Sequence, residues 1–100
     1  MNAYQVPPAE LESLIKEHPA VLDAAVIGIP DSSTGEKPKA FVVLHKGADV
    51  TEKNIMEHVT DRVAPYKRLK EVQFVDSIHK NPTGKILRRL LLEDHMKHRK

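Results

Sequence analysis

The chain has 100 residues, no cysteine and a formal net charge of +2, and 40% of its residues are hydrophobic, enough for a modest core. A chain of this length forms one small domain, with little room for a deep substrate cavity. The lack of cysteine excludes a disulfide framework and a Cys-based zinc site. No apolar run approaches the roughly 20 residues of a membrane-spanning helix, and nothing resembles a secretory signal, so we expect a soluble intracellular domain.

Charge is distributed unevenly along the chain. Residues 1–61 hold five Lys/Arg and ten Asp/Glu, whereas residues 62–100 hold eleven and four. The basic C-terminal third could meet nucleic acid, a phosphorylated ligand or an acidic protein surface, and charge alone does not decide among them.

The first half of the chain predicts one helix and two strands. A helix should begin at Pro8, which suits a first helical position, and should end near His18, because a proline follows. Dense apolar and β-branched residues predict strands over 20–31 and 39–47. The stretch between them, "SSTGEK" at 32–37, is typical of a loop.

The second half predicts a helix, a strand and a helix. Thr51 is a plausible N-cap for a helix that ends near Ala64, where a proline follows. A shorter strand is expected over 70–78 and a last helix over 86–96. Three such strands need helices to bury their faces, so the sequence predicts an α+β domain with a small three-stranded sheet packed against three helices.

Charged side chains on the predicted helices are expected to lie in solvent, with arginine stems lying along apolar surface. The residues expected in solvent are Glu10, Glu12, Glu17, Arg88 and Arg89, and those expected in the core include Phe41 and Phe74.

The stretch "NPTGKILRRL", residues 81–90, combines features that suit an anion. Thr83 could cap the last helix, Gly84 would let a ligand approach closely, and Lys85 would add a full positive charge. A P-loop is excluded, because a histidine stands where its first glycine is required and an isoleucine replaces its Ser/Thr. The alternative from these residues alone is an ordinary turn with a solvated lysine.

Three stretches occur together in the order and spacing of one known family: "AYQVPPAELESLIKEHPAVLDAAVIGIPD", "VAPYKRLKEVQFVDSI" and "KNPTGKILRR". They resemble the C-terminal domain of the adenylate-forming superfamily of acyl- and aryl-CoA ligases and firefly-type luciferases. "YQVPPAELE" is most similar to the luciferase and 4-coumarate–CoA ligase branch. The resemblance covers nearly the whole chain and implies that residues 1–100 are a mobile C-terminal lid domain, whose large N-terminal partner domain is not in this chain.

The resemblance implies a two-step reaction, in which a carboxylic acid and MgATP give an acyl-adenylate, and the thiol of CoA then displaces AMP. A luciferase-type oxidation is the other outcome known in the superfamily. Lys85 matches the adenylation lysine, with Thr83 and Gly84 beside the adenylate. ATP and Mg would be bound mainly by the large domain, so the isolated chain should lack full activity.

Two further pairs of residues have a role by resemblance. Tyr4 and Gln5 match a segment that lines the thiol tunnel, and the alternative for them is a frayed terminal strand. Lys67 and Arg68 could dock on the large domain or contact CoA phosphates, and the alternative is that they serve as cations after a helix end.

The six histidines show no spacing typical of a metal site, although His95 and His98 are three residues apart on the last helix. His79 replaces the proline common in the family and is expected to be solvated. We predict that this domain binds no metal.

A freestanding basic module for nucleic acid or an acidic partner is the alternative function. The chain has only four aromatic residues, so no stacking platform is apparent, and we predict no nucleic-acid partner. Cytoplasm is the default location, and peroxisomes are suggested by some relatives, although the chain ends "KHRK" without an S-K-L address.

Overall fold

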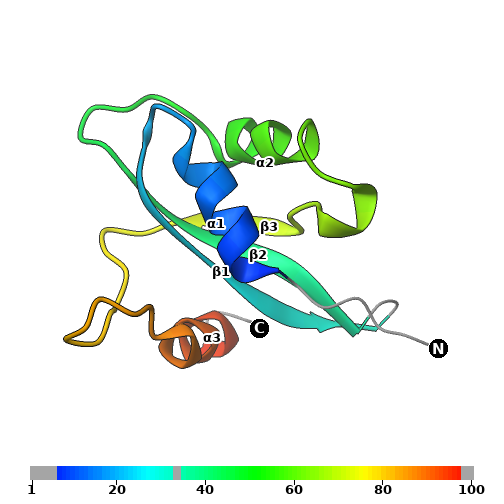
Figure 1. The fold of residues 1–100 in the computed structure, drawn as a ribbon, viewed down its shortest axis with the longest axis vertical. Helices are drawn as coiled ribbons and strands as arrows, with labels where there is room; N and C mark the ends of the chain where they lie inside the picture. The colour runs from blue at the N-terminus through cyan, green and yellow to red at the C-terminus, as the bar shows by residue number, and fades with distance from the viewer. Residues whose placement is uncertain (1–6, 33–34, 98–100) are drawn as a thin grey trace.

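The computed structural model describes residues 7–32 and 35–97. In chain order its elements are α1 (Pro8–Lys16), β1 (Val21–Asp31), β2 (Gly35–Leu44), α2 (Glu52–Thr60), the short 3-10 helix η1 (Pro65–Lys67), β3 (Glu71–Phe74) and α3 (Arg88–Lys97). The three strands form one sheet in the order β1-β2-β3, with β1 antiparallel and β3 parallel to β2 (Figure 1). The predicted α+β architecture of a three-stranded sheet and three helices is confirmed.

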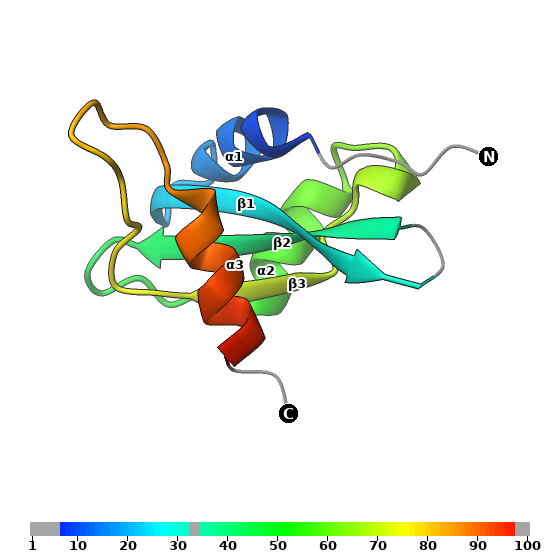
Figure 2. The same cartoon turned by 90° about the horizontal axis from the view of Figure 1, so that it is seen from below.

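Helices cover both faces of the sheet (Figures 1 and 2). α1 and α2 lie on one face, where their apolar residues meet strand residues such as Val26 and Val42. α3 lies on the other face, where Leu91 joins a second cluster with Ile27 and Phe41. Successive strand residues point to opposite faces, so burial of both faces explains why the sequence of β1 is apolar almost throughout.

The strand boundaries differ from those expected. β2 begins at Gly35 rather than at residue 39, because the polar stretch that reads as a loop continues the antiparallel ladder, with Asp31 opposite Gly35. β3 ends at Phe74 rather than at residue 78, since its pairing with β2 ends there and the chain then leaves the sheet. The pattern of apolar and polar residues therefore does not predict these two strand ends, because backbone pairing with the neighbouring strand determines where each strand begins and ends.

The start of α2 is as expected. The Thr51 hydroxyl accepts a hydrogen bond from the Asn54 N–H at 3.1 Å, and the Asn54 side chain accepts one from the Thr51 N–H at 2.9 Å. This capping box satisfies two backbone donors that the helix leaves unpaired. The helix ends at Thr60 rather than near Ala64.

The outer edge of β1 is closed by an ion pair between α1 and α3. The Glu12 carboxylate accepts the Val26 N–H at 2.8 Å, and the Arg88 Nε donates to the Val26 carbonyl at 3.1 Å. Arg88 Nη2 also lies 2.7 and 2.9 Å from the two Glu12 oxygens. The two side chains occupy the backbone groups that a further strand would use, which protects the edge.

The expectation that Glu12 and Arg88 are solvated is therefore wrong. Glu12 is only 6% exposed, and its burial is tolerated because the arginine and a backbone N–H both bond its carboxylate. Arg89, one residue further on, is exposed as expected.

A second buried charge lies under α3. Lys39 is 1% exposed, and its Nζ lies 2.8 Å from Gln73 Oε1, 3.0 Å from Glu71 Oε2 and 2.9 Å from His95 Nδ1. It also lies 4.7 Å from the centre of the Phe41 ring. His95 is therefore a buried partner of Lys39 rather than an exposed histidine available to share a metal with His98, which lies outside the described residues.

Candidate functional site

Residues 79–87, which contain Lys85, form a small hairpin that we call the Lys85 arm. The Leu87 N–H donates to the His79 carbonyl at 3.0 Å, and Lys80 and Ile86 form an antiparallel bridge. Closer to the tip, the Asn81 N–H donates to the Lys85 carbonyl at 2.9 Å. Figures 1 and 2 both show the arm projecting from the end of the molecule opposite to the end of β1 and the beginning of β2.

Asn81 bonds most of the polar groups at the tip of the arm. Its Oδ1 accepts hydrogen bonds from the Thr83 N–H at 3.0 Å, the Thr83 hydroxyl at 2.7 Å and the Lys85 N–H at 2.9 Å. The Gly84 N–H donates to the Asn81 carbonyl at 2.8 Å. The tip is therefore a closed turn of the kind that asparagine side chains stabilise.

The expectation that Thr83 caps the last helix is wrong. α3 begins at Arg88, five residues beyond Thr83, because the chain between them completes the hairpin. Lys85 therefore does not lie at a helix N-terminus, and its charge does not oppose a helix dipole.

Gly84 and Lys85 lie at the tip, and both are exposed. Gly84 has a φ of +86°, which disfavours other residues, and a Cβ at this position would meet nothing within 4 Å. Among residues 7–32 and 35–97, none is seen to pair with the Lys85 ammonium. The tip thus presents an exposed cation beside a residue without a side chain, so an anion could approach the ammonium closely.

The base of the arm is fixed to the sheet. Lys80 Nζ lies 2.7 Å from Asp23 Oδ2 on β1, and Ile78 and Ile86 pack against the second core cluster. Arg88, the first residue of α3, is bonded to β1 and α1 as described above. Lys85 is therefore carried on a short hairpin whose two ends are held by packing and charge.

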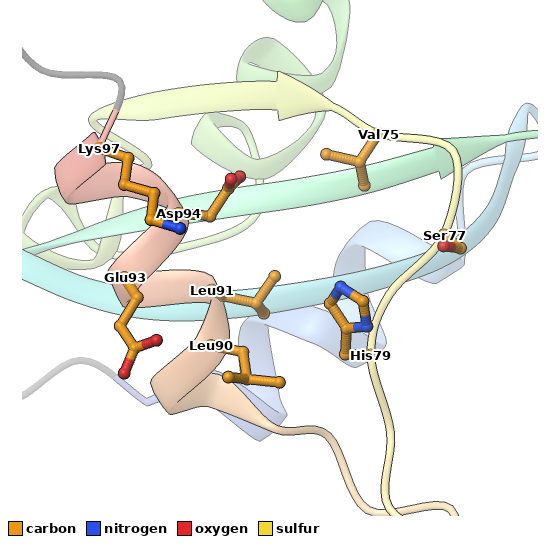
Figure 3. Close-up of a pocket in the computed structure, with 8 residues that line it drawn as sticks. All are labelled: Val75, Ser77, His79, Leu90, Leu91, Glu93, Asp94 and Lys97. Atoms are coloured by element: carbon orange, nitrogen blue, oxygen red, sulfur yellow. The ribbon is translucent and has the colours of Figure 1, made fainter.

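Two open hollows lie near the base of the arm. One, of about 270 Å³, lies between α3 and residues 75–79, and His79 faces Leu91 across it (Figure 3). The other, of about 430 Å³, lies beside the Lys80–Asp23 pair. Neither is lined by Lys85, and each is small for a site that would hold a nucleotide and an acyl group together.

Lys67 and Arg68 lie far from Lys85. They belong to η1 and its C-terminal cap, at the end of the molecule away from the arm (Figures 1 and 2). Lys67 Nζ lies 3.0 Å from Glu10 Oε2, so Glu10 also has a partner, although its side chain is half exposed. Arg68 is exposed. The structure does not bring this pair to the arm, and their role in docking or CoA binding stays a prediction.

The structure gives no view of the two residues predicted to line the thiol tunnel. Tyr4 and Gln5 lie outside the described residues, so their role stays a prediction.

In the described part of the chain, no three His, Asp or Glu side chains come together in a group that could hold a metal ion. No helix there is long and apolar enough to cross a membrane.

Sequence reasoning missed the residues that position Lys85. The Asn-Pro pair at 81–82 is a recognised turn signal, and it could have identified Asn81 as the residue that organises the tip. Asp23 gave no signal, because its contact with Lys80 depends on the fold.

Comparisons with known proteins show the family of this chain and support its fold. The family model described as the AMP-binding enzyme C-terminal domain matches residues 10–85. The chain is 56% identical over 92 residues to the peroxisomal OPC-8:0-CoA ligase 1 of Arabidopsis thaliana, and 51% identical over 92 residues to the 4-coumarate–CoA ligase-like protein 5 of Oryza sativa subsp. japonica. Each match covers 92% of this chain and 17% of the relative, so the chain spans about one sixth of their length.

A solved structure, the anthranilate CoA ligase AuaEII in complex with anthranoyl-AMP, has the same fold over this segment. It superposes with a TM-score of 0.80 at 39% identity, covering 94% of this chain and 19% of that one. The resemblance to the adenylate-forming superfamily, and to its 4-coumarate–CoA ligase branch, is thereby confirmed. The chain belongs to the family of AMP-binding enzyme C-terminal domains.

Proposed function

We propose that this chain is the C-terminal domain of an ATP-dependent acid–CoA ligase, and that Lys85 supplies positive charge to the adenylation step. The observation that carries the proposal is the exposed ammonium at the tip of an arm with a fixed base, next to the open space beside Gly84. Family membership supports a ligase over a nucleic-acid-binding module.

The chemistry explains why one amine at this place matters. In adenylation, a carboxylate oxygen of the acid forms a bond to the α-phosphorus of ATP, and the bond from that phosphorus to pyrophosphate breaks. Two anions must approach each other, and negative charge concentrates on the oxygens between them. The Lys85 ammonium, on its long stem, can contact both reacting groups and offset their repulsion.

The arm contributes position as well as charge. Its base is held by the Lys80–Asp23 pair and by packing of Ile86, so Lys85 starts from a defined point. Charge that is held in place costs less reorganisation in the transition state than charge recruited from solvent.

The rest of the active site would come from a large N-terminal domain. The two hollows near the base of the arm are small for ATP and an acid together, and we expect the isolated chain not to turn over. The large domain would hold the acid and ATP, together with the Mg²⁺ that accompanies ATP.

The second half-reaction would use another surface of the same domain. The thiol of CoA would attack the acyl carbon and release AMP, and Tyr4 and Gln5 would lie along the thiol path after the lid moves. Lys67 and Arg68, on a different end of the molecule from Lys85, suit docking on the large domain or contact with CoA phosphates. The Arabidopsis relative is named as peroxisomal, and peroxisome or cytoplasm stays the prediction for this chain.

A fusion tests the proposal. Residues 1–100 would replace the matching segment of the Arabidopsis OPC-8:0-CoA ligase, and OPC-8:0-dependent exchange of pyrophosphate into ATP would be measured with OPC-8:0-CoA formation. The fusion should exceed the truncated large domain in both assays, and Lys85→Ala should lower exchange roughly 10²-fold to 10³-fold.

Two results would count against the proposal. One is a fusion no more active than the truncated large domain, and the other is wild-type exchange by the Lys85→Ala fusion.

A further inference from the structure

We infer that Asn81 is a positioning residue for Lys85: its side-chain oxygen holds the tip of the arm in the turn from which the ammonium reaches the reacting anions. This inference rests on the proposed function and adds to it a residue outside the Thr83, Gly84 and Lys85 set.

The tip is the part of the arm that the fold itself does not hold. On one side, Lys80 is paired with Asp23, and on the other, Ile86 packs against the core. Between them the chain is exposed at Pro82, Thr83, Gly84 and Lys85, so packing cannot define its shape. Hydrogen bonds must do so.

Three of those hydrogen bonds end on one atom. Asn81 Oδ1 accepts from the Thr83 N–H, the Thr83 hydroxyl and the Lys85 N–H at 2.7–3.0 Å. The bond to the Lys85 N–H fixes the backbone from which the reactive side chain extends. Gly84 would otherwise leave this turn free to sample many conformations.

Removing this oxygen should affect rate more than binding. If the closed turn becomes one of several conformers, only the fraction in the right conformer can react, and the turnover number falls in proportion to that fraction. ATP and the acid would be held by the large domain, so their apparent affinities should change little.

The matched variants are Asn81→Ala, which removes the acceptor, and Asn81→Asp, which keeps an oxygen at the same position for all three donors. In the fusion with the OPC-8:0-CoA ligase large domain, we expect Asn81→Ala to lower the turnover number of OPC-8:0 adenylation about tenfold, the effect of one to two net hydrogen bonds. The KM for ATP should stay unchanged. Asn81→Asp keeps the turn but adds a negative charge beside Lys85, so it serves as a control for the shape of the turn and not for the rate.

Two further readouts separate positioning from folding. Thioester formation from supplied OPC-8:0-adenylate and CoA should be unchanged in Asn81→Ala, because that half-reaction does not use Lys85. In the amide NMR spectrum of the 100-residue chain, the Thr83 and Lys85 amide protons should exchange faster with solvent in Asn81→Ala but not in Asn81→Asp.

The outcomes are distinct. The inference is overturned if Asn81→Ala adenylates at the wild-type rate while Lys85→Ala does not, if the Thr83 and Lys85 amide protons exchange no faster in Asn81→Ala than in Asn81→Asp, or if both half-reactions fall together. If Lys85→Ala itself adenylates normally, the proposed function fails first.

Discussion

Lys85 and Arg88 are three residues apart in the sequence, and their charges have opposite surroundings. Arg88 reaches back to β1 and α1, where it bonds the Val26 carbonyl and a Glu12 side chain that is 8% exposed. Lys85 extends from the tip of the arm, where the neighbouring backbone N–H groups already bond Asn81. One cation helps to hold the fold, and the other is exposed, as its proposed role in adenylation requires.

The comparison shows how a small domain separates stability from chemistry. A cation bonded to a buried carboxylate and a carbonyl holds two helices to the edge of a sheet, and its loss leaves the carboxylate buried without a balancing charge. A cation that must meet a substrate cannot be committed in this way. The arm solves this by satisfying its polar groups internally, through Asn81, rather than through the lysine.

Arg88→Ala should have the largest effect on stability. It would leave the Glu12 carboxylate buried with only the Val26 N–H, and we expect the free energy of unfolding to fall by about 3 kcal/mol. Arg89→Ala is the matched control, because this neighbouring arginine is exposed, and it should change the free energy by less than about 0.5 kcal/mol.

Urea unfolding of the 100-residue chain measures both variants. Equal effects of the two substitutions would show that the Arg88–Glu12 pair does not stabilise the fold more than an exposed arginine does.

Gly84→Ala should have a smaller effect on stability, with a separate effect on activity. Its φ of +86° costs an alanine about 1 kcal/mol. Gly47 offers a control, since it has a φ of +84° and the same open space around a Cβ but lies outside the arm. Both variants should lose similar stability in urea, and only Gly84→Ala should slow adenylation in the fusion. Slower adenylation in Gly47→Ala as well would mean that the tip of the arm has no special role.

The smallest effect concerns pH and a histidine remote from the arm. Burial lowers the pKa of His18, and the nearby His58 and Arg62 lower it further. Because the folded chain binds the proton less readily than the unfolded chain, stability should fall as pH drops below the ordinary histidine value of about 6.5 and towards the lowered pKa.

His18→Asn should reduce this loss. An asparagine oxygen can still accept the Ala20 N–H that His18 Nδ1 accepts at 3.1 Å, and it does not titrate. Thermal unfolding of both proteins between pH 7 and pH 5 measures the difference. Identical pH dependence in the two proteins would show that protonation of His18 does not cause the loss of stability.

Local patterns predicted much of the fold. The apolar run of β1, the Thr51 cap and the three helices follow from spacing, turn residues and capping chemistry that involve near neighbours. The start of β2 was missed because its first residues are polar and are held by pairing across the hairpin. The start of α3 was predicted two residues too early, because Ile86 still pairs with Lys80 in the arm and the helix begins only at Arg88.

Buried charges could not be predicted from local patterns. Glu12 and Arg88 are 76 residues apart in sequence, and Lys39 and His95 are 56 apart. On a predicted helix or strand each of them reads as a surface residue, since only the fold shows that a partner is present. For the candidate site, residue type and resemblance singled out Lys85, whose role stays a prediction, whereas the Asp23 contact that anchors its arm required the structure.

The most direct test of the central claim is to follow the two half-reactions separately in the fusion carrying Lys85→Met, which keeps much of the side chain's length without the charge. We predict that single-turnover formation of OPC-8:0-adenylate falls roughly 10²-fold to 10³-fold. Conversion of supplied adenylate to the CoA thioester should stay at the wild-type rate. Adenylate formation at full rate, or equal loss in both steps, would contradict the assignment of Lys85 as the charge that brings the two anions together.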